Sequence, residues 1–168
     1  MPKEDNAPGM LQANIICRVA ESGGSESVTS KSVRYSPFDT YVGIDLKDGI
    51  YETDTDLRFP VIAVNPDGLK AGKQELEWKI YKLGWSWWWE GNSEDLNRYV
   101  SGKSADVVAS GTLTTSAGKA ELPFRLDYPD WGRFLIIIKD KKGGHTTGGV
   151  VTIDWPQWRG RSNKSASE

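Results

Sequence analysis

Apolar and charged residues alternate with a period of two along much of the chain. Leu76, Trp78 and Ile80 alternate with charged residues, and residues 120–126 repeat the pattern. This period predicts strands that bury one face. Pro123 lies inside the second segment and removes one donor from the hydrogen-bond ladder. We therefore expect that strand at the edge of a sheet or at a bulge.

Two further segments predict a central pair of strands. Residues 133–139 contain five successive apolar residues, 134–138, which predicts a strand buried on both faces. We expect residues 149–155 (GVVTIDW) to pair with it. The β-branched residues of 107–114 favour another strand. Together these segments indicate a sheet rather than isolated hairpins.

Turn sequences separate the predicted strands. In Asn65-Pro-Asp-Gly68, Pro presets φ and Gly accepts a positive φ, and we expect the glycine-containing segments 116–118 and 141–144 to close hairpins. Many short strands with turns between them predict an all-β, antiparallel β-sandwich of about seven strands. Its predicted core consists of apolar residues on the alternating faces: Val61, Ala63, Trp78, Ile80, Phe124, Phe134, Ile136, Ile138 and Val151.

The first third of the chain predicts an extra N-terminal β-hairpin. Residues 11–20 and 26–35 have strand character, and Ile15, Cys17 and Val19 give the first of them an apolar face. A two-stranded hairpin alone is marginally stable in water. We expect this face to pack either on the following sandwich or on a domain upstream.

The pattern divides the chain into three parts. The hairpin and a linker occupy residues 1–38, where Ser36-Pro37 interrupts the strand pattern. The sandwich occupies residues 39–156, and a polar linker rich in Ser, Arg and Lys occupies residues 157–168.

Charge and composition narrow the classes of function. The net charge is −2, which argues against duplex nucleic acid because that partner requires a basic face. The single Cys17 excludes an internal disulfide, and the single His145 leaves little for metal or triad chemistry. The longest apolar run, 134–138, is far shorter than the about 18 residues of a membrane span, and Met1–Met10 lacks signal-peptide features. We expect no nucleic-acid partner, no membrane contact by this chain and no cofactor.

Four tryptophans form the strongest candidate surface. On a strand, Trp85, Trp87 and Trp89 share one face while Trp88 points to the other. The rings could form a platform for sugars or for a partner protein, or they could cover the sandwich as ordinary packing. Both interpretations stay open at the level of sequence.

The remaining candidates carry weak signals. Asp54 and Asp56 are spaced like the start of a calcium loop but lack its glycine and distal glutamate, which favours a solvated entry to a strand. His145 lies at a predicted hairpin tip with no second His or Cys near it in sequence, which argues against a metal site. A glycosidase requires two carboxylates at a suitable separation, and three acidic residues follow the tryptophans: Glu90, Glu94 and Asp95.

Six segments in order resemble the bacterial alpha-2-macroglobulins. Each is short, but their order and spacing match a macroglobulin-like domain just before the bait-region domain of that family. Upstream, residues 18–24 and 35–37 resemble the closing hairpin of the preceding domain. The six segments are 41–44 (YVGI), 57–68 (LRFPVIAVNPDG), 78–82 (WKIYK), 85–90 (WSWWWE), 110–120 (SGTLTTSAGKA) and 131–140 (WGRFLIIIKD).

The resemblance implies a macroglobulin-like sandwich of immunoglobulin type within a large protease trap. It implies that residues 1–38 are the closing hairpin of a preceding macroglobulin-like domain plus a linker. In such traps, cleavage of a bait region triggers a conformational collapse, and a thioester captures the protease. The expected location is the bacterial cell envelope, as a periplasmic protein or outer-membrane lipoprotein. The expected partners are neighbouring domains of the same chain and, for the whole protein, a target protease.

The sequence departs from the family in its reactive parts. The thioester signature Cys-x-Glu-Gln is absent, because Cys17 is followed by Arg-Val-Ala, and we expect the bait region beyond Glu168. The sequence therefore predicts a non-catalytic structural module of an endopeptidase inhibitor, without catalytic, metal-binding or thioester residues. The alternative is a carbohydrate-binding β-sandwich module that uses an exposed tryptophan face.

Overall fold

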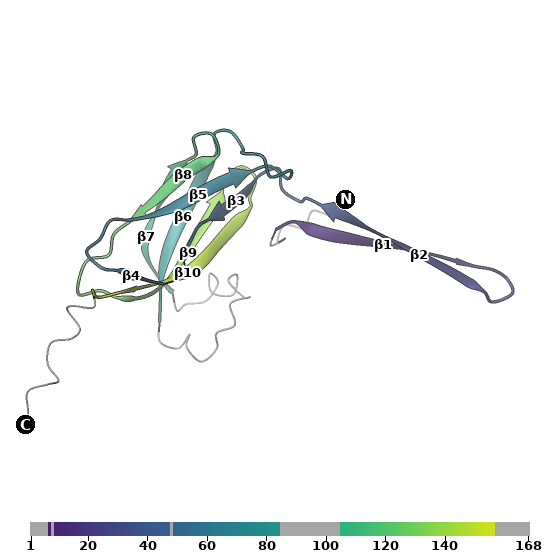
Figure 1. Ribbon diagram of the computed structural model, residues 1–168, viewed down its shortest axis with the longest axis horizontal. Coiled ribbons are helices and arrows are strands. Elements are labelled where there is room, and N and C mark those ends of the chain that lie inside the picture. Colours follow the sequence, from purple (N-terminus) through teal and green to yellow (C-terminus); the bar gives the residue numbers. More distant parts are fainter. Residues whose placement is uncertain (1–6, 8, 48, 85–104, 157–168) are drawn as a thin grey trace, which may run out of the picture.

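The structure, a computed structural model, describes residues 7, 9–47, 49–84 and 105–156. Figure 1 shows two parts, a β-sandwich and a long two-stranded hairpin that projects from one end of it. The described residues form ten strands and no helix. The strands are β1 (Leu11–Ala20), β2 (Glu26–Tyr35), β3 (Tyr41–Ile44), β4 (Ile50–Glu52), β5 (Leu57–Val64), β6 (Glu75–Leu83), β7 (Ala105–Thr114), β8 (Lys119–Phe124), β9 (Gly132–Asp140) and β10 (Thr146–Asp154).

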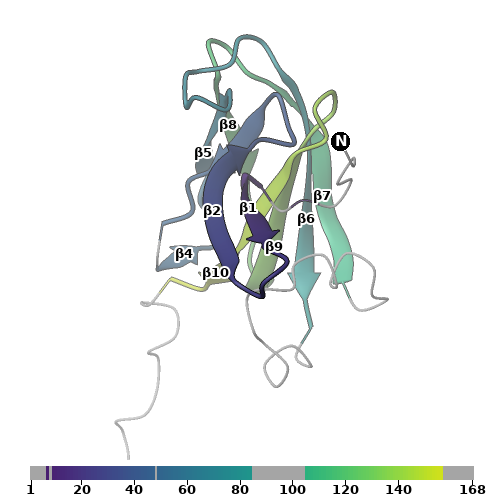
Figure 2. The ribbon, with the colours of Figure 1, turned by 90° about the vertical axis from the view of Figure 1, so that its right-hand side faces the viewer.

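The sandwich consists of a five-stranded and a three-stranded sheet. Their strand orders are β4-β10-β9-β6-β7 and β3-β5-β8, and Figure 2 shows β5 and β8 on one side with β6 and β7 on the other. The predicted all-β sandwich is confirmed. The strand β4 adds to the expected seven and runs parallel to β10 rather than antiparallel. Its three residues are too few to show a period of two, so the pattern gave no sign of it.

The predicted central pair of strands is confirmed. Strand β9 lies between β10 and β6 in the five-stranded sheet, and successive residues Phe134, Leu135 and Ile136 are all buried. A strand with two buried faces reads as a continuous apolar run because neither face meets water. Val151 of β10 lies opposite Phe134 in the ladder.

The core lies between the two sheets. Phe124 of β8 and Phe134 of β9 meet across it with ring centroids 6.1 Å apart. Burying each such side chain contributes about 1.5–3 kcal/mol. Eight of the nine predicted core residues are buried, and the ninth, Trp78, is partly buried against the cluster. The core also contains Val42, Phe59, Leu76, Leu122 and Ile153.

Trp78 is only partly buried because its indole lies across the neighbouring strand. It pairs with Gly111 of β7, and a Cβ atom at Gly111 would lie only 2.7 Å from the indole Cζ2 atom. The missing side chain therefore makes the space that the ring occupies. The prediction of Trp78 as a core residue holds for its packing but not for complete burial.

Two of the predicted turns have different outcomes. Residues 141–144 close the β9–β10 hairpin, where the Gly144 backbone N–H donates to the Asp140 carbonyl at 2.9 Å. The predicted turn at 116–118 is present, because Ser116 and Lys119 exchange two backbone hydrogen bonds, but the prediction that it joins adjacent strands of one sheet is wrong, because β7 and β8 lie in different sheets. Both strands carry an inward apolar face, and the sandwich buries such faces by placing them in opposite layers. Pro123 lies in β8 at the edge of its sheet, as predicted.

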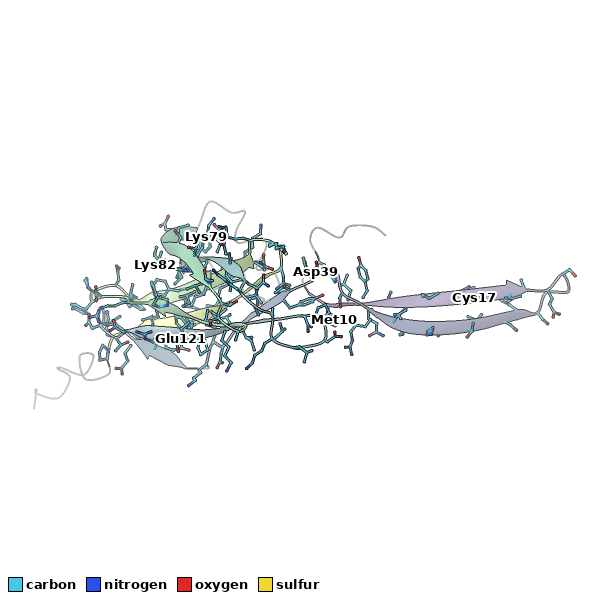
Figure 3. The ribbon with its side chains drawn as sticks, turned by 90° about the horizontal axis from the view of Figure 1, so that it is seen from above. Met10, Cys17, Asp39, Lys79, Lys82 and Glu121 are labelled. Atoms are coloured by element: carbon cyan, nitrogen blue, oxygen red, sulfur yellow. The ribbon has the colours of Figure 1, made fainter. Side chains whose placement is uncertain are left out.

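The N-terminal hairpin pairs over its whole length. The register runs from Leu11 opposite Tyr35 to Ala20 opposite Glu26. Figures 1 and 3 show the two strands extending away from the sandwich, with Cys17 far along them. Nearly every residue of both strands is exposed. The sandwich therefore does not cover the apolar face of the hairpin, although packing on the sandwich was one of the two expected arrangements.

Candidate functional site

The sequence-predicted tryptophan surface lies outside the described residues. This holds for Trp85, Trp87, Trp88 and Trp89 and for the three acidic residues that follow them, Glu90, Glu94 and Asp95. Their roles as a platform, a packing cover or a carboxylate pair stay predictions. The polar linker 157–168 lies outside the described residues as well.

Asp54 and Asp56 stabilise a turn. The Asp54 carboxylate accepts a hydrogen bond from the Tyr128 backbone N–H at 3.0 Å, and Asp54 itself has a φ of 61°. Asp56 pairs with Arg125 at 3.1 Å. Both carboxylates thus join the turn before β5 to the segment after β8. No group of three or more His, Cys, Asp or Glu side chains among residues that the structure describes could hold a metal ion.

Arg125 connects two carboxylates at this turn. Its guanidinium donates to Asp127 at 2.7 Å and to Asp56 at 3.1 Å. The hydrogen bond with Asp127, followed by that with Asp56, raises the pKa of Arg125 above its ordinary value. The ion pairs are exposed, so their role is to hold the turn rather than to supply stability.

An aromatic cluster that sequence reasoning missed lies at the end of the sandwich. The Trp155 ring packs against Tyr128 at 5.4 Å and Trp131 at 6.0 Å between centroids, and the Trp155 indole N–H donates to the Pro129 carbonyl at 3.2 Å. Tyr128 and Trp131 are about half exposed. The antiparallel pairing of Gly132 with Ile153 brings these segments together. Trp131 precedes β9 and Trp155 follows β10, and the sequence predicted that these two strands pair. That predicted pairing could have identified the cluster.

The hairpin carries two chemically different faces. Residues directly opposite in an antiparallel pair point to the same side, so the register sorts the side chains. One side, here called the apolar face, carries Leu11, Ala13, Ile15, Cys17, Val19, Val33 and Tyr35, together with the polar Ser27, Thr29 and Lys31. Ile15 and Val19 are 58% and 61% exposed. The apolar face is thus uncovered by any part of the chain that the structure describes.

The opposite side of the hairpin, here called the polar face, is suited to water. Arg18 pairs with Glu26 at 3.9 Å, and the Ser32 hydroxyl donates to the Asn14 side-chain oxygen at 2.6 Å. Ile16 and Val28 are the large apolar residues on this side. The two sides therefore differ in the amount of apolar surface that they present.

His145 lies where the hairpin joins the sandwich. It precedes β10, and its Nδ1 atom accepts a hydrogen bond from the Val42 backbone N–H at 3.0 Å. Its ring packs against Phe38 at 5.2 Å and Tyr41 at 5.0 Å between centroids. These four residues, here called the joint, connect the linker after β2 to the β9–β10 turn. The predicted hairpin tip is correct, but the sequence gave no sign that His145 would be buried.

Burial governs the charge of His145. The residue is only 6% exposed, and this desolvation lowers its pKa below the ordinary value of 6.5. The buried Asp140 acts in the opposite direction through its negative charge, with a smaller effect. His145 is therefore neutral at pH 7, with its proton on Nε2 because Nδ1 accepts.

Cys17 lies in an exposed strand of the hairpin. Its thiol is free and exposed, and it lies in the middle of β1 opposite Thr29. Strand β1 supplies no helix N-terminus that would activate a thiol.

In the described ranges, the chain holds no helix of the length and apolar character needed to cross a membrane.

Comparison with protein families matches the sandwich. A family model described as bacterial macroglobulin domain 6 matches residues 43–155, which is more than half of the 168 residues. The match begins within β3 and ends just after β10. No curated protein matches the chain.

Proposed function

The chain belongs to the bacterial alpha-2-macroglobulin family, with its sandwich as a domain 6, and on that premise we propose that it is a non-catalytic structural module of an endopeptidase inhibitor. The family match over residues 43–155 carries the proposal. Macroglobulin domains serve as structural modules of larger chains. The close-packed core between the two sheets suits such a role, because it fixes the described strands relative to one another.

The hairpin is the part of this chain that contacts its neighbour. We propose that residues 1–38 are the closing hairpin and linker of a preceding macroglobulin-like domain, and that the apolar face packs inside that domain. The exposure of Ile15 and Val19 supports this assignment, because a two-stranded hairpin with an uncovered apolar face is marginal by itself. The polar face, with its Arg18–Glu26 pair, then stays in water.

Cys17 provides a direct test of this packing. It is the single cysteine of the chain and lies on the apolar face. In a longer chain that includes the residues upstream, its reaction with a maleimide should slow at least tenfold relative to the present chain. The matched control combines Cys17→Ser with Ser30→Cys, which places the thiol on the polar face. Equal reactivity of Cys17 in both chains would refute the assignment.

The protease-trap activity requires parts outside this chain. We expect no stoichiometric inhibition when the chain alone is mixed with a panel of endopeptidases, because the sequence has no Cys-x-Glu-Gln motif. The protein that contains it should retain the cleaved protease in a complex visible by gel filtration. Inhibition by the isolated chain, or absence of any retained complex with the whole protein, would contradict the proposal.

A matched pair of substitutions tests whether the hairpin supports trapping. In the whole protein, Ile15→Asp places a charge on the apolar face, and Ile16→Asp places the same charge on the polar face. A buried unpaired charge is strongly unfavourable, so the first variant should lose retained protease and the second should keep it. Equal effects would show that the two faces have the same environment.

The cell location is a further proposal, which the family membership supports. We propose a periplasmic protein or an outer-membrane lipoprotein, where a protease trap meets proteases from outside the cell. Fractionation of the source cells, followed by detection with an antibody against this chain, tests it. Recovery in the cytoplasmic fraction would refute this location without affecting the fold or the family.

A further inference from the structure

The joint holds the chain where it passes from the hairpin into the sandwich. Strands β1 and β2 extend away from the sandwich (Figure 3), so their orientation depends on the short segment between Tyr35 and Tyr41. Within that segment, Pro37 has a fixed φ, and Phe38 packs against His145 and Tyr41. The angle of the hairpin is therefore set by how firmly this segment is held.

His145 holds the segment by a hydrogen bond that forms only when its imidazole is neutral. The Val42 N–H points at Nδ1 across 3.0 Å in a buried setting. A neutral imidazole accepts there, whereas an imidazolium carries a proton on both nitrogens and accepts nothing. On protonation, two N–H donors would face each other. The bond is then lost, and a buried backbone N–H loses its acceptor.

We propose that His145 is a pH-dependent clamp on the joint: the neutral ring fixes the Phe38–Val42 segment, and protonation releases it, so that the hairpin takes a wider range of orientations relative to the sandwich. The step moves one proton from solvent to Nδ1 and breaks one hydrogen bond. The proposal concerns this chain itself and does not rest on the proposed trap activity.

Charged and titratable groups from several elements surround the His145 ring and influence its protonation. From β9, the buried Asp140 favours the cation. From the turn, the exposed Lys141 pairs with Glu75 at 3.6 Å and the exposed Lys142 donates its backbone N–H to Asp140. From the linker and β3, Asp39 is exposed and the buried Tyr41 hydroxyl has no hydrogen-bond partner among the described residues.

Burial outweighs the attraction of Asp140. It lowers the pKa of His145 below 6.5, so the clamp is closed at neutral pH and opens in acid. His145 is harder to protonate when it is buried in the closed joint than when the joint is released. Lowering the pH therefore favours the released state. The midpoint of the opening therefore lies below pH 6.5.

The single histidine allows a direct check of the clamp's chemistry. His145 is the one imidazole of the chain, so its ring nitrogens are assigned without ambiguity by nitrogen-15 NMR. We expect an unprotonated Nδ1 and a protonated Nε2 at pH 8, and a shift of the Val42 amide that follows the same titration curve. A proton on Nδ1 at pH 8 would overturn the proposal.

The orientation of the hairpin is measured between two spin labels on the full chain. The native Cys17 carries one label and a Glu121→Cys substitution carries the other; both sites are exposed and far apart (Figure 3). The distance distribution should be narrow at pH 8 and at least twofold broader at pH 5. An unchanged distribution between these values would overturn the proposal.

Two variants separate the clamp from other acid effects. His145→Asn places a non-titrating oxygen near the Nδ1 position, so its distribution should stay narrow at both pH values. Asp140→Asn keeps an acceptor for the Lys142 N–H but removes the charge that favours the cation, so its broadening should occur at lower pH than in the natural chain. Broadening in the His145→Asn variant equal to that of the natural chain, or an Asp140→Asn midpoint at higher pH, would refute the clamp.

Discussion

The hairpin and the sandwich share one sequence pattern but have opposite environments. Ile15 and Val19 in β1 alternate with their neighbours much as Leu76 and Ile80 do in β6. Leu76 and Ile80 are 0% exposed, whereas Ile15 and Val19 are more than half exposed. The alternation therefore predicts a strand and its two faces, whereas burial depends on a second layer that the local pattern does not contain.

The two regions should differ most in the free energy of unfolding that is lost when an apolar side chain is truncated. Phe134→Ala removes a ring with 0% exposure and should lower the free energy of unfolding by about 3–5 kcal/mol. Val19→Ala on the hairpin should change it by less than about 0.5 kcal/mol, because no packing is lost. Urea denaturation of the full chain measures both. Comparable losses would show that the hairpin is part of the cooperative core.

The sequence predicted the sandwich well where burial left a pattern. Phe134 and Ile136 belong to an apolar run that identifies the central strand. The short β4 left no period, and the burial of His145 comes from Phe38, more than 100 residues away. Such contacts between distant segments have no local signature. The same holds for Trp155, whose neighbours in the aromatic cluster are brought together by strand pairing.

The two regions should differ less in the stability that is lost when a side chain is enlarged. Gly111→Val would place atoms against the Trp78 indole, within 2.7 Å of Cζ2, and should cost about 1–3 kcal/mol. The comparable change on the hairpin, Ser30→Val opposite Ile16, should stay within about 0.5 kcal/mol. Thermal unfolding of the two variants gives the difference.

A double-mutant cycle identifies the cause of the first loss. Trp78→Leu should reduce the cost of Gly111→Val, because a smaller side chain leaves room for the added atoms. Additive losses would show that the indole is not the obstacle.

The joint adds a pH dependence to the stability of the sandwich. Since burial lowers the pKa of His145, the unfolded chain binds its proton from pH 6.5 downward while the folded chain still resists it. The contribution of His145 is thus complete above pH 6.5 and decreases as the pH falls below it. Urea midpoints at pH 8, 6.5 and 5.5 should show a decrease that is smaller in His145→Asn. A steeper decrease in that variant would reverse the sign and contradict the assignment.

The smallest effect is expected when the two regions are separated. A chain of residues 38–168 lacks both hairpin strands but retains Phe38 and the whole joint. Since β1 and β2 add no layer to the core, its melting temperature should lie within a few degrees of that of the full chain, and its near-ultraviolet circular dichroism should be unchanged. A second chain that begins at Thr40 also loses Phe38, which packs on His145, and should melt lower than the first. If the 38–168 chain is unfolded, the hairpin belongs to the sandwich core and the boundary at residue 38 is wrong. If both shortened chains melt alike, Phe38 does not support the joint.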